Sequence, residues 1–139
     1  MTRRLRDWRP RFEAVVDEIK WTQFDWETQH DCVMGLVVRL VEAVTGVDHG
    51  AAYRGRYASE TGALRVMRKA GFSDIADLVA SILDEIHPSQ AAIGDLVAFK
   101  VDTPFGHALG VVNGERAFVL RPEGIATMDI LEADRAFKV

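Results

Sequence analysis

The chain has 139 residues, of which 48% are hydrophobic and 27% are charged, and its formal net charge is −4. This length and composition favour one globular domain with a sizeable core, and the acidic balance gives no reason to expect nucleic acid as a partner. The single cysteine excludes an internal disulfide. The first residues lack the apolar segment of a secretory signal, and the main apolar stretch, about 13 residues, is shorter than the ~20 that span a bilayer. We therefore expect no signal peptide and no membrane span.

The N-terminal segment, residues 1–11, is basic, with five arginines and one acid, Asp7. It is either a solvated arm or an electrostatic tether to an acidic partner surface. Residues 10–20 are predicted to be helical, because Pro10 suits a first turn and apolar residues recur every three or four positions. We divide the chain into a basic arm, residues 1–11, and a single domain, residues 12–139.

The most apolar segment, residues 32–44, predicts a central helix. Asp31 can cap its start, and Gly46 suits the left-handed position after its end. A helix that is apolar nearly all round is buried. Cys32 lies in its first turn, where backbone N–H groups and the helix dipole favour a thiolate. The aromatic residues of segment 21–26 could wall a cleft beside the sulfur.

Residues 47–57 are predicted to form a loop. Arg54 and Arg56 could bind a carboxylate or pair with local acids. Asp48 and His49 resemble half of a metal site, but the sequence offers no second group of ligands. We expect no metal ion and no cofactor.

Two further helices are predicted from their caps and apolar spacing. Ser59 begins one that ends near Ala70 and Gly71. Ser73 begins the next, which extends to about Ile86, since Pro88 prevents continuation. Neither helix carries evident chemistry, and His87 is interpreted as a partner of the helix dipole.

After Gly94 the pattern changes to strands. Segments 95–101, 107–112 and 116–121 are rich in β-formers, Asn113-Gly114 is a strong hairpin signal, and segments 125–130 and 135–139 add one or two strands. Helices followed by an antiparallel sheet make an α+β fold. The central helix is expected to pack on this sheet.

Cys32 and His107, which opens the second strand, form a candidate catalytic pair. A thiol nucleophile needs a base within hydrogen-bonding reach, and such pairs meet in space rather than in sequence. The alternatives are that Cys32 is a small buried apolar group and that His107 is structural. His30, next to Asp31, is expected to lie on the surface.

Three motifs carry a resemblance to a known family. Trp26-x-x-x-x-Asp31-Cys32 resembles the opening of NlpC-like cell-wall peptidases, which have a papain-type fold. Gly94–Phe99 resembles their Gly-Asp-Leu-Val-x-Phe strand, and His107–Gly114 their His-x-Gly-Ile-Tyr-x-Gly strand and turn. Together with segments 45–48, 53–57 and 135–137, the chain resembles a small group encoded in the tail modules of bacteriophages and gene-transfer agents.

The resemblance implies a cysteine peptidase or amidase that cuts peptidoglycan stem peptides during cell-wall penetration. Cys32 would be the nucleophile and His107 the general base, and the backbone N–H of Cys32 or its neighbour would help to hold the oxyanion. The protein would be made in the bacterial cytoplasm and carried in a virion tail, among other tail or baseplate proteins.

Two features depart from the family pattern. Glu27 replaces a glycine after the motif tryptophan, and the polar residue that usually orients the histidine is missing from the next strand. Depending on the turn, the residue opposite His107 would be Leu120, Pro122 or Arg121, none of which suits that role. The alternative function is therefore a catalytically weak or inert structural component of a tail tip with the same fold.

Overall fold

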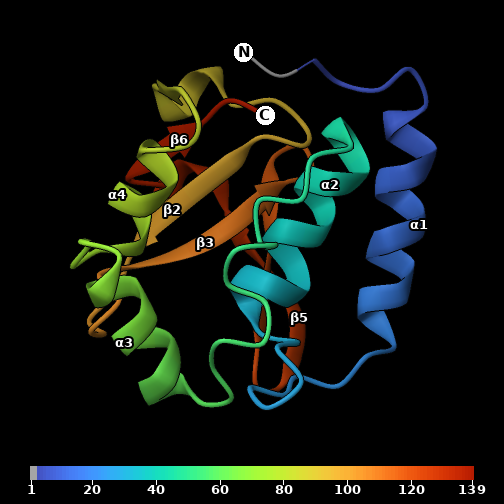
Figure 1. Ribbon diagram of the computed structural model, residues 1–139. Helices are drawn as coiled ribbons and strands as arrows, with labels where there is room; N and C mark the ends of the chain where they lie inside the picture. Colours follow the sequence, from blue (N-terminus) through green and yellow to red (C-terminus); the bar gives the residue numbers. More distant parts are fainter. Residues whose placement is uncertain (1–2) are drawn as a thin grey trace.

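The computed structural model describes residues 3–139, and Figure 1 shows its helices and strands. The helical segments are α1 (Trp8–Lys20), the π-helical η1 (Cys32–Val37), α2 (Val38–Thr45), α3 (Glu60–Lys69), α4 (Ile75–Ala80) and the short 3-10 turns η2 (Pro88–Gln90) and η3 (Ile130–Glu132). The strands are β1 (Glu85–Ile86), β2 (Leu96–Lys100), β3 (His107–Val112), β4 (Arg116–Arg121), β5 (Gly124–Asp129) and β6 (Arg135–Phe137).

The strands form one antiparallel sheet in the order β1-β6-β2-β3-β4-β5. The last strand, β6, returns to the middle of the sheet and lies between β1 and β2. Most helices precede the sheet, so the predicted α+β class is confirmed.

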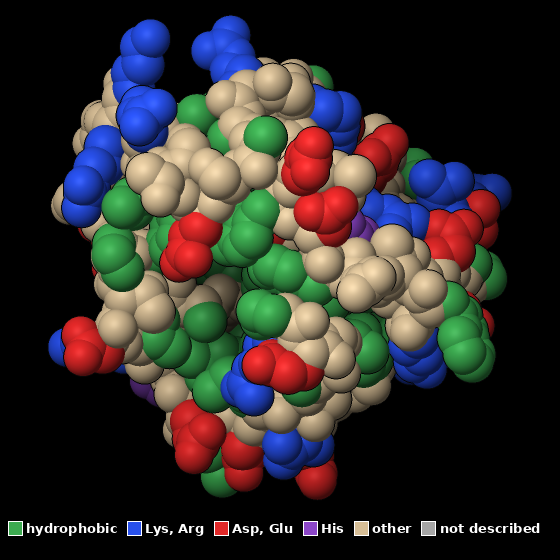
Figure 2. Space-filling model, turned by 90° about the horizontal axis from the view of Figure 1, so that it is seen from below, with side chains coloured by type: hydrophobic (Ala, Val, Ile, Leu, Met, Phe, Trp, Pro, Cys, Tyr) green, Lys and Arg blue, Asp and Glu red, His purple; other side chains and the backbone are tan. Residues whose placement is uncertain are grey.

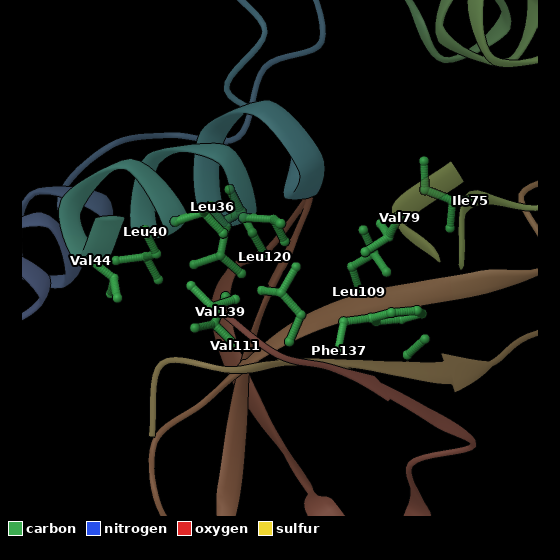
Figure 3. Close-up of a cluster of buried hydrophobic side chains, with 14 of the residues drawn as sticks. Leu36, Leu40, Val44, Ile75, Val79, Leu109, Val111, Leu120, Phe137 and Val139 are labelled. Carbon is green, nitrogen blue, oxygen red and sulfur yellow. The ribbon is translucent and has the colours of Figure 1, made fainter. Parts of the chain in front are cut away.

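The main core lies between the sheet and the helices that cover one of its faces. η1 and α2 present Leu36, Leu40 and Val44 to Leu109, Val111 and Leu120 of the sheet, and α4 adds Ile75 and Val79 (Figure 3). Leu36, Leu40 and Val44 are fully buried, so the predicted central buried helix is confirmed. α1 packs on the outer side of α2 (Figure 1).

A smaller core covers the opposite face of the sheet. It is built on Val97, Phe99, Val112 and Val119, which alternate along the strands with the residues of the main core. The sheet is thus buried on both faces near its centre.

The predicted helix from Ser73 to Ile86 is wrong at both ends. Asp74, not Ser73, is the cap, and its side chain accepts from the Ala76 N–H. The helix ends at Ala80, and Glu85–Ile86 forms strand β1, whose backbone pairs with β6. This distant pairing overrides the local helical pattern.

The basic segment is bound to the domain over the part that the structure describes. Arg4 donates to the carbonyl oxygens of Val139 (3.0 Å) and Ile93 (2.8 Å) and to the carboxylate of Asp95 (3.0 Å). Arg11 donates to the carbonyl oxygen of Ala43 (2.9 Å). The solvated interpretation therefore does not hold for Arg4 and Arg11. Helix α1 also begins earlier than predicted, at Trp8, and residues 1–2 of the predicted arm lie outside the described residues.

Asp95 connects the two ends of the chain to the sheet. It is fully buried, and its carboxylate accepts from the N–H groups of Ala92 and Val139, both at 2.9 Å, in addition to Arg4. Lys138 lies 3.7 Å away. The aspartate of the Gly94–Phe99 motif thus has a structural role.

Among residues 3–139, no helix combines the length and the apolar character that crossing a membrane would require.

Candidate active site

Cys32 is the first residue of η1, and Asp31 caps it as predicted. One oxygen of Asp31 accepts from the N–H groups of Val33 (3.0 Å) and Met34 (3.1 Å). The other accepts from the hydroxyl of Tyr57 at 2.7 Å. Asp31 is buried and directly precedes Cys32, and these hydrogen bonds fix its carboxylate close to the sulfur.

Cys32 belongs to η1, which packs over the two neighbouring strands β3 and β4. Its Sγ donates to the carbonyl oxygen of Leu109 at 3.1 Å. The two strands pair only at Val111–Phe118 and Val112–Ala117, so Leu109 lies beyond the end of this ladder. The half-buried thiol therefore satisfies a carbonyl group where the two strands separate.

The thiol is not the poised thiolate that its place in the helix suggested. Burial, the dominant cause, raises the pKa of Cys32 to about 11, and the charge of Asp31 raises that pKa further. The N–H of Leu120 and the charge of Arg121 oppose the rise. The expectation of a lowered pKa was wrong chiefly because burial deprives a thiolate of its hydration. In addition, the Asp31 carboxylate already occupies the N–H groups of the first turn.

His107 opens β3, as predicted, and its ring lies between two carboxylates. Nδ1 is 2.9 Å from both oxygens of Asp74, and Nε2 is 2.7 Å from Oδ2 of Asp134. The side chain of His107 is 8% exposed. We call this cluster, Asp74–His107–Asp134, the His107 clamp.

The clamp partners come from elements on the β6 side of β3, and Cys32 comes from an element on the β4 side. Asp74 caps α4, which packs over β3 and β6, and Asp134 precedes β6. Cys32 instead lies over β3 and β4, and its thiol hydrogen bond goes to Leu109. Cys32 and His107 nevertheless line the same cavity.

Two local features bring Asp74 to the histidine. The N–H of Ile75 donates to the carbonyl oxygen of Phe105 at 2.9 Å, which joins the start of α4 to the loop before β3. Gly106 has φ +78°, and a Cβ there would collide with the Asp74 carboxylate. Only glycine suits both the conformation and the close approach.

The orienting carboxylates were missed by the sequence analysis. The turn places Gly114 and Glu115 at its centre, since Asn113 donates to the Arg116 carbonyl, and continuing the pairing of Val111 with Phe118 puts Pro122 opposite His107. That register is one of those considered, and it supplies no polar partner. The partners come instead from a helix cap and from the segment before β6.

A cavity of about 390 Å³ lies between η1 and α2 on one side and α3 and α4 on the other. Figure 2 shows hydrophobic side chains gathered around a hollow on the face seen from below. Apolar residues dominate the lining, among them Val33, Met34, Val37, Val66, Met67, Leu78 and Leu83. A pocket of this size suits a small-molecule or side-chain ligand.

The aromatic segment 21–26 does wall the cavity, as expected. The ring of Trp26 stacks on Phe105 with centroids 6.3 Å apart and meets Phe24 and Tyr57 edge-on. These aromatic residues all line the cavity. Trp21, by contrast, is 90% exposed.

The other candidate residues have structural surroundings. Arg54 pairs with Asp48 at 2.6 Å, as the local-pairing interpretation proposed. His30, expected on the surface, is buried, and burial lowers its pKa. His87 caps η2 by accepting from the Ser89 N–H and is not at a helix C-terminus. Within residues 3–139, no group of three or more His, Cys, Asp or Glu side chains could hold a metal ion.

The fold is that of the NlpC/p60 class. The crystal structure of the NlpC/p60 domain of peptidoglycan hydrolase SagA is similar to this chain, with a TM-score of 0.57 and 18% sequence identity, over 94% of this chain and 97% of that chain. The chain belongs to the family described as Domain of unknown function (DUF6950), which matches residues 3–139. No curated protein sequence matches the chain.

Proposed function

We propose that the chain is a cysteine peptidase or amidase that acts on peptidoglycan peptides, with Cys32 as nucleophile and His107 as general base. One observation carries the proposal. A thiol at the first turn of a buried helix and an imidazole at the start of a strand line one cavity in a chain with an NlpC/p60-like fold.

In the proposed reaction, Cys32 attacks the carbonyl carbon of the substrate amide while its proton passes to His107. The C–N bond then breaks, and the leaving amine takes that proton from the imidazolium. Water, activated by His107, hydrolyses the thioester. Since Asp31 occupies the N–H groups of Val33 and Met34, we assign stabilisation of the oxyanion to the backbone N–H of Cys32.

The cavity lining favours one kind of substrate group. Its walls are mostly aliphatic and aromatic, and burying a charged group against such walls is costly unless the charge is paired. We expect the group that enters beside Cys32 to be small and apolar, such as the methyl group of an alanine in a stem peptide.

We also propose that the protein is made in the bacterial cytoplasm and works in the tail of a phage-type particle, where a wall-cutting domain would aid penetration. The support is the resemblance of segments 45–48, 53–57 and 135–137 to proteins of tail modules. The partners would be other tail or baseplate proteins.

A second candidate function is that of a tail component with the same fold and no chemistry. The raised pKa of Cys32, its hydrogen bond to Leu109 and the two carboxylates on His107 favour it. Under this alternative, Cys32→Ala leaves incorporation into particles unchanged.

The test is the release of soluble fragments from purified peptidoglycan. We expect the wild-type chain to release peptide fragments and Cys32→Ala to release none, with both proteins equally folded by circular dichroism. His107→Ala should lower the rate by at least about 100-fold, the scale of general-base catalysis. Equal release by Cys32→Ala would overturn the proposal.

A further inference from the structure

The hydrogen bonds of the His107 clamp occupy both nitrogens of the ring. Carboxylate oxygens lie 2.9 Å from Nδ1 and 2.7 Å from Nε2. While both contacts are in place, neither nitrogen is free to accept the proton of Cys32.

The two carboxylates are held with different firmness. Asp74 is fixed by its own capping bond to the Ala76 N–H (2.8 Å) and by close packing against Gly106, and both its oxygens reach Nδ1. Asp134 offers one oxygen, its side chain is 49% exposed, and its carboxylate makes no other hydrogen bond within residues 3–139. The Asp134 contact is therefore the one that breaks more easily.

The charges around the clamp stabilise the ionised form of Asp134. The hydrogen bond from His107 lowers the pKa of Asp134, and the charges of Lys100 and Arg135 lower it further. Arg135 itself is held by Asp77 and Glu85. Asp134 thus faces His107 as a carboxylate.

We propose that Asp74 and Asp134 are positioning residues that control whether His107 can accept the proton of Cys32. Together they occupy both ring nitrogens. Loss of the Asp134 contact frees Nε2 as a base for the thiol, while Asp74 continues to hold Nδ1. This inference rests on the proposed function only in pairing Cys32 with His107, and most molecules of the free chain then hold the site in this occupied form.

The test measures alkylation of Cys32, the only cysteine, by iodoacetamide. In this reaction a C–S bond forms, iodide leaves, and the thiol proton passes to Nε2 of His107 when that nitrogen is free. We expect Asp134→Ala to raise the rate at pH 7 at least about tenfold and to shift the pH profile to lower pH, because a paired thiol ionises more easily. Asp134→Asn, which preserves size, should give a smaller increase.

The matched control is Glu132→Ala, which removes one exposed carboxylate from the same segment and should leave the rate within about twofold of wild type, as expected for a solvent-screened surface charge. Circular dichroism and urea unfolding check that each variant is folded. If Asp134→Ala is no faster than Glu132→Ala, the proposal is overturned.

A double substitution separates a freed base from a loosened structure. His107→Ala in the Asp134→Ala background should remove the gain. A gain that persists without His107 would show general opening and overturn the proposal. Because no peptidoglycan is used, a failure of wall hydrolysis leaves this result unaffected.

Discussion

The thiol of Cys32 donates a hydrogen bond to the carbonyl oxygen of Leu109, with an Sγ–O distance of 3.1 Å. The bond forms where β3 and β4 cease to pair, so it satisfies a carbonyl group that the sheet ladder leaves open. The acceptor favours the thiol over the thiolate, since only the thiol can donate. The same contact therefore stabilises the fold and lowers the reactivity of the sulfur.

Alkylation of the wild-type chain should report this protonated thiol. With a pKa of about 11, only about one thiol in ten thousand is ionised at pH 7. The rate with iodoacetamide should rise about tenfold per pH unit from pH 7 to 10 and approach a plateau near pH 11. A plateau near the free-thiol value of about 8.5 would contradict the raised pKa.

Removing the charge of Asp31 should make the thiol more acidic. Asp31→Asn retains an oxygen that can cap η1 but removes the anion that raises the pKa of Cys32. We expect alkylation at pH 8 to be about threefold faster, which corresponds to roughly half a pKa unit. The control, Asp17→Asn, neutralises an exposed carboxylate on α1 and should have no effect. An unchanged rate in Asp31→Asn would show that its charge does not reach the sulfur.

Gly106→Ala should destabilise the chain more than a matched glycine substitution. Gly106 and Gly55 have nearly equal φ angles, +78° and +77°, but a Cβ at Gly55 meets nothing within 4 Å. Gly55→Ala should cost about 1 kcal/mol for its left-handed backbone. Gly106→Ala should cost roughly 1–2 kcal/mol more, because it also displaces the carboxylate of Asp74. Urea unfolding measures both, and equal costs would exclude the close packing.

Asp95→Asn should weaken the attachment of both chain ends. The substitution leaves the guanidinium of Arg4, whose side chain is 21% exposed, without its anionic partner. We expect a loss of about 2–4 kcal/mol in the free energy of unfolding, measured in urea with an unchanged slope. The exposed Asp102→Asn should stay within about 0.5 kcal/mol of wild type. Equal unfolding midpoints for the two variants would contradict the role of Asp95.

The capping residues and the glycine after a helix correctly predicted where several helices begin and end. Asp31 and Ser59 cap their helices, and Gly46 adopts the left-handed conformation after α2 with φ +79°. The error lay at α4 and β1, because a strand of two residues exists only through its pairing with β6. Such a pairing has no signal in the neighbouring sequence.

The sequence predicted the two central residues of the candidate site, Cys32 and His107, but not the side chains that surround them. The motifs pointed to Cys32 and His107, and the structure brings both to one cavity. Asp74 and Asp134 lie 33 and 27 positions from His107 and outside the neighbouring strand, so no local sequence pattern connects them to the histidine. The raised pKa of the Cys32 thiol was not predictable from the helix position alone, because it comes first from tertiary burial and then from the charge of Asp31 beside the sulfur.

The most direct test is fragment release from purified peptidoglycan by wild type, Asp134→Ala and Cys32→Ala, with mass spectrometry of Cys32 for the acyl intermediate. We expect slow release by wild type, faster release by Asp134→Ala with acylated Cys32, and none by Cys32→Ala. No release by Asp134→Ala, or equal release by Cys32→Ala, would contradict this expectation. The first of these results would favour the structural tail component.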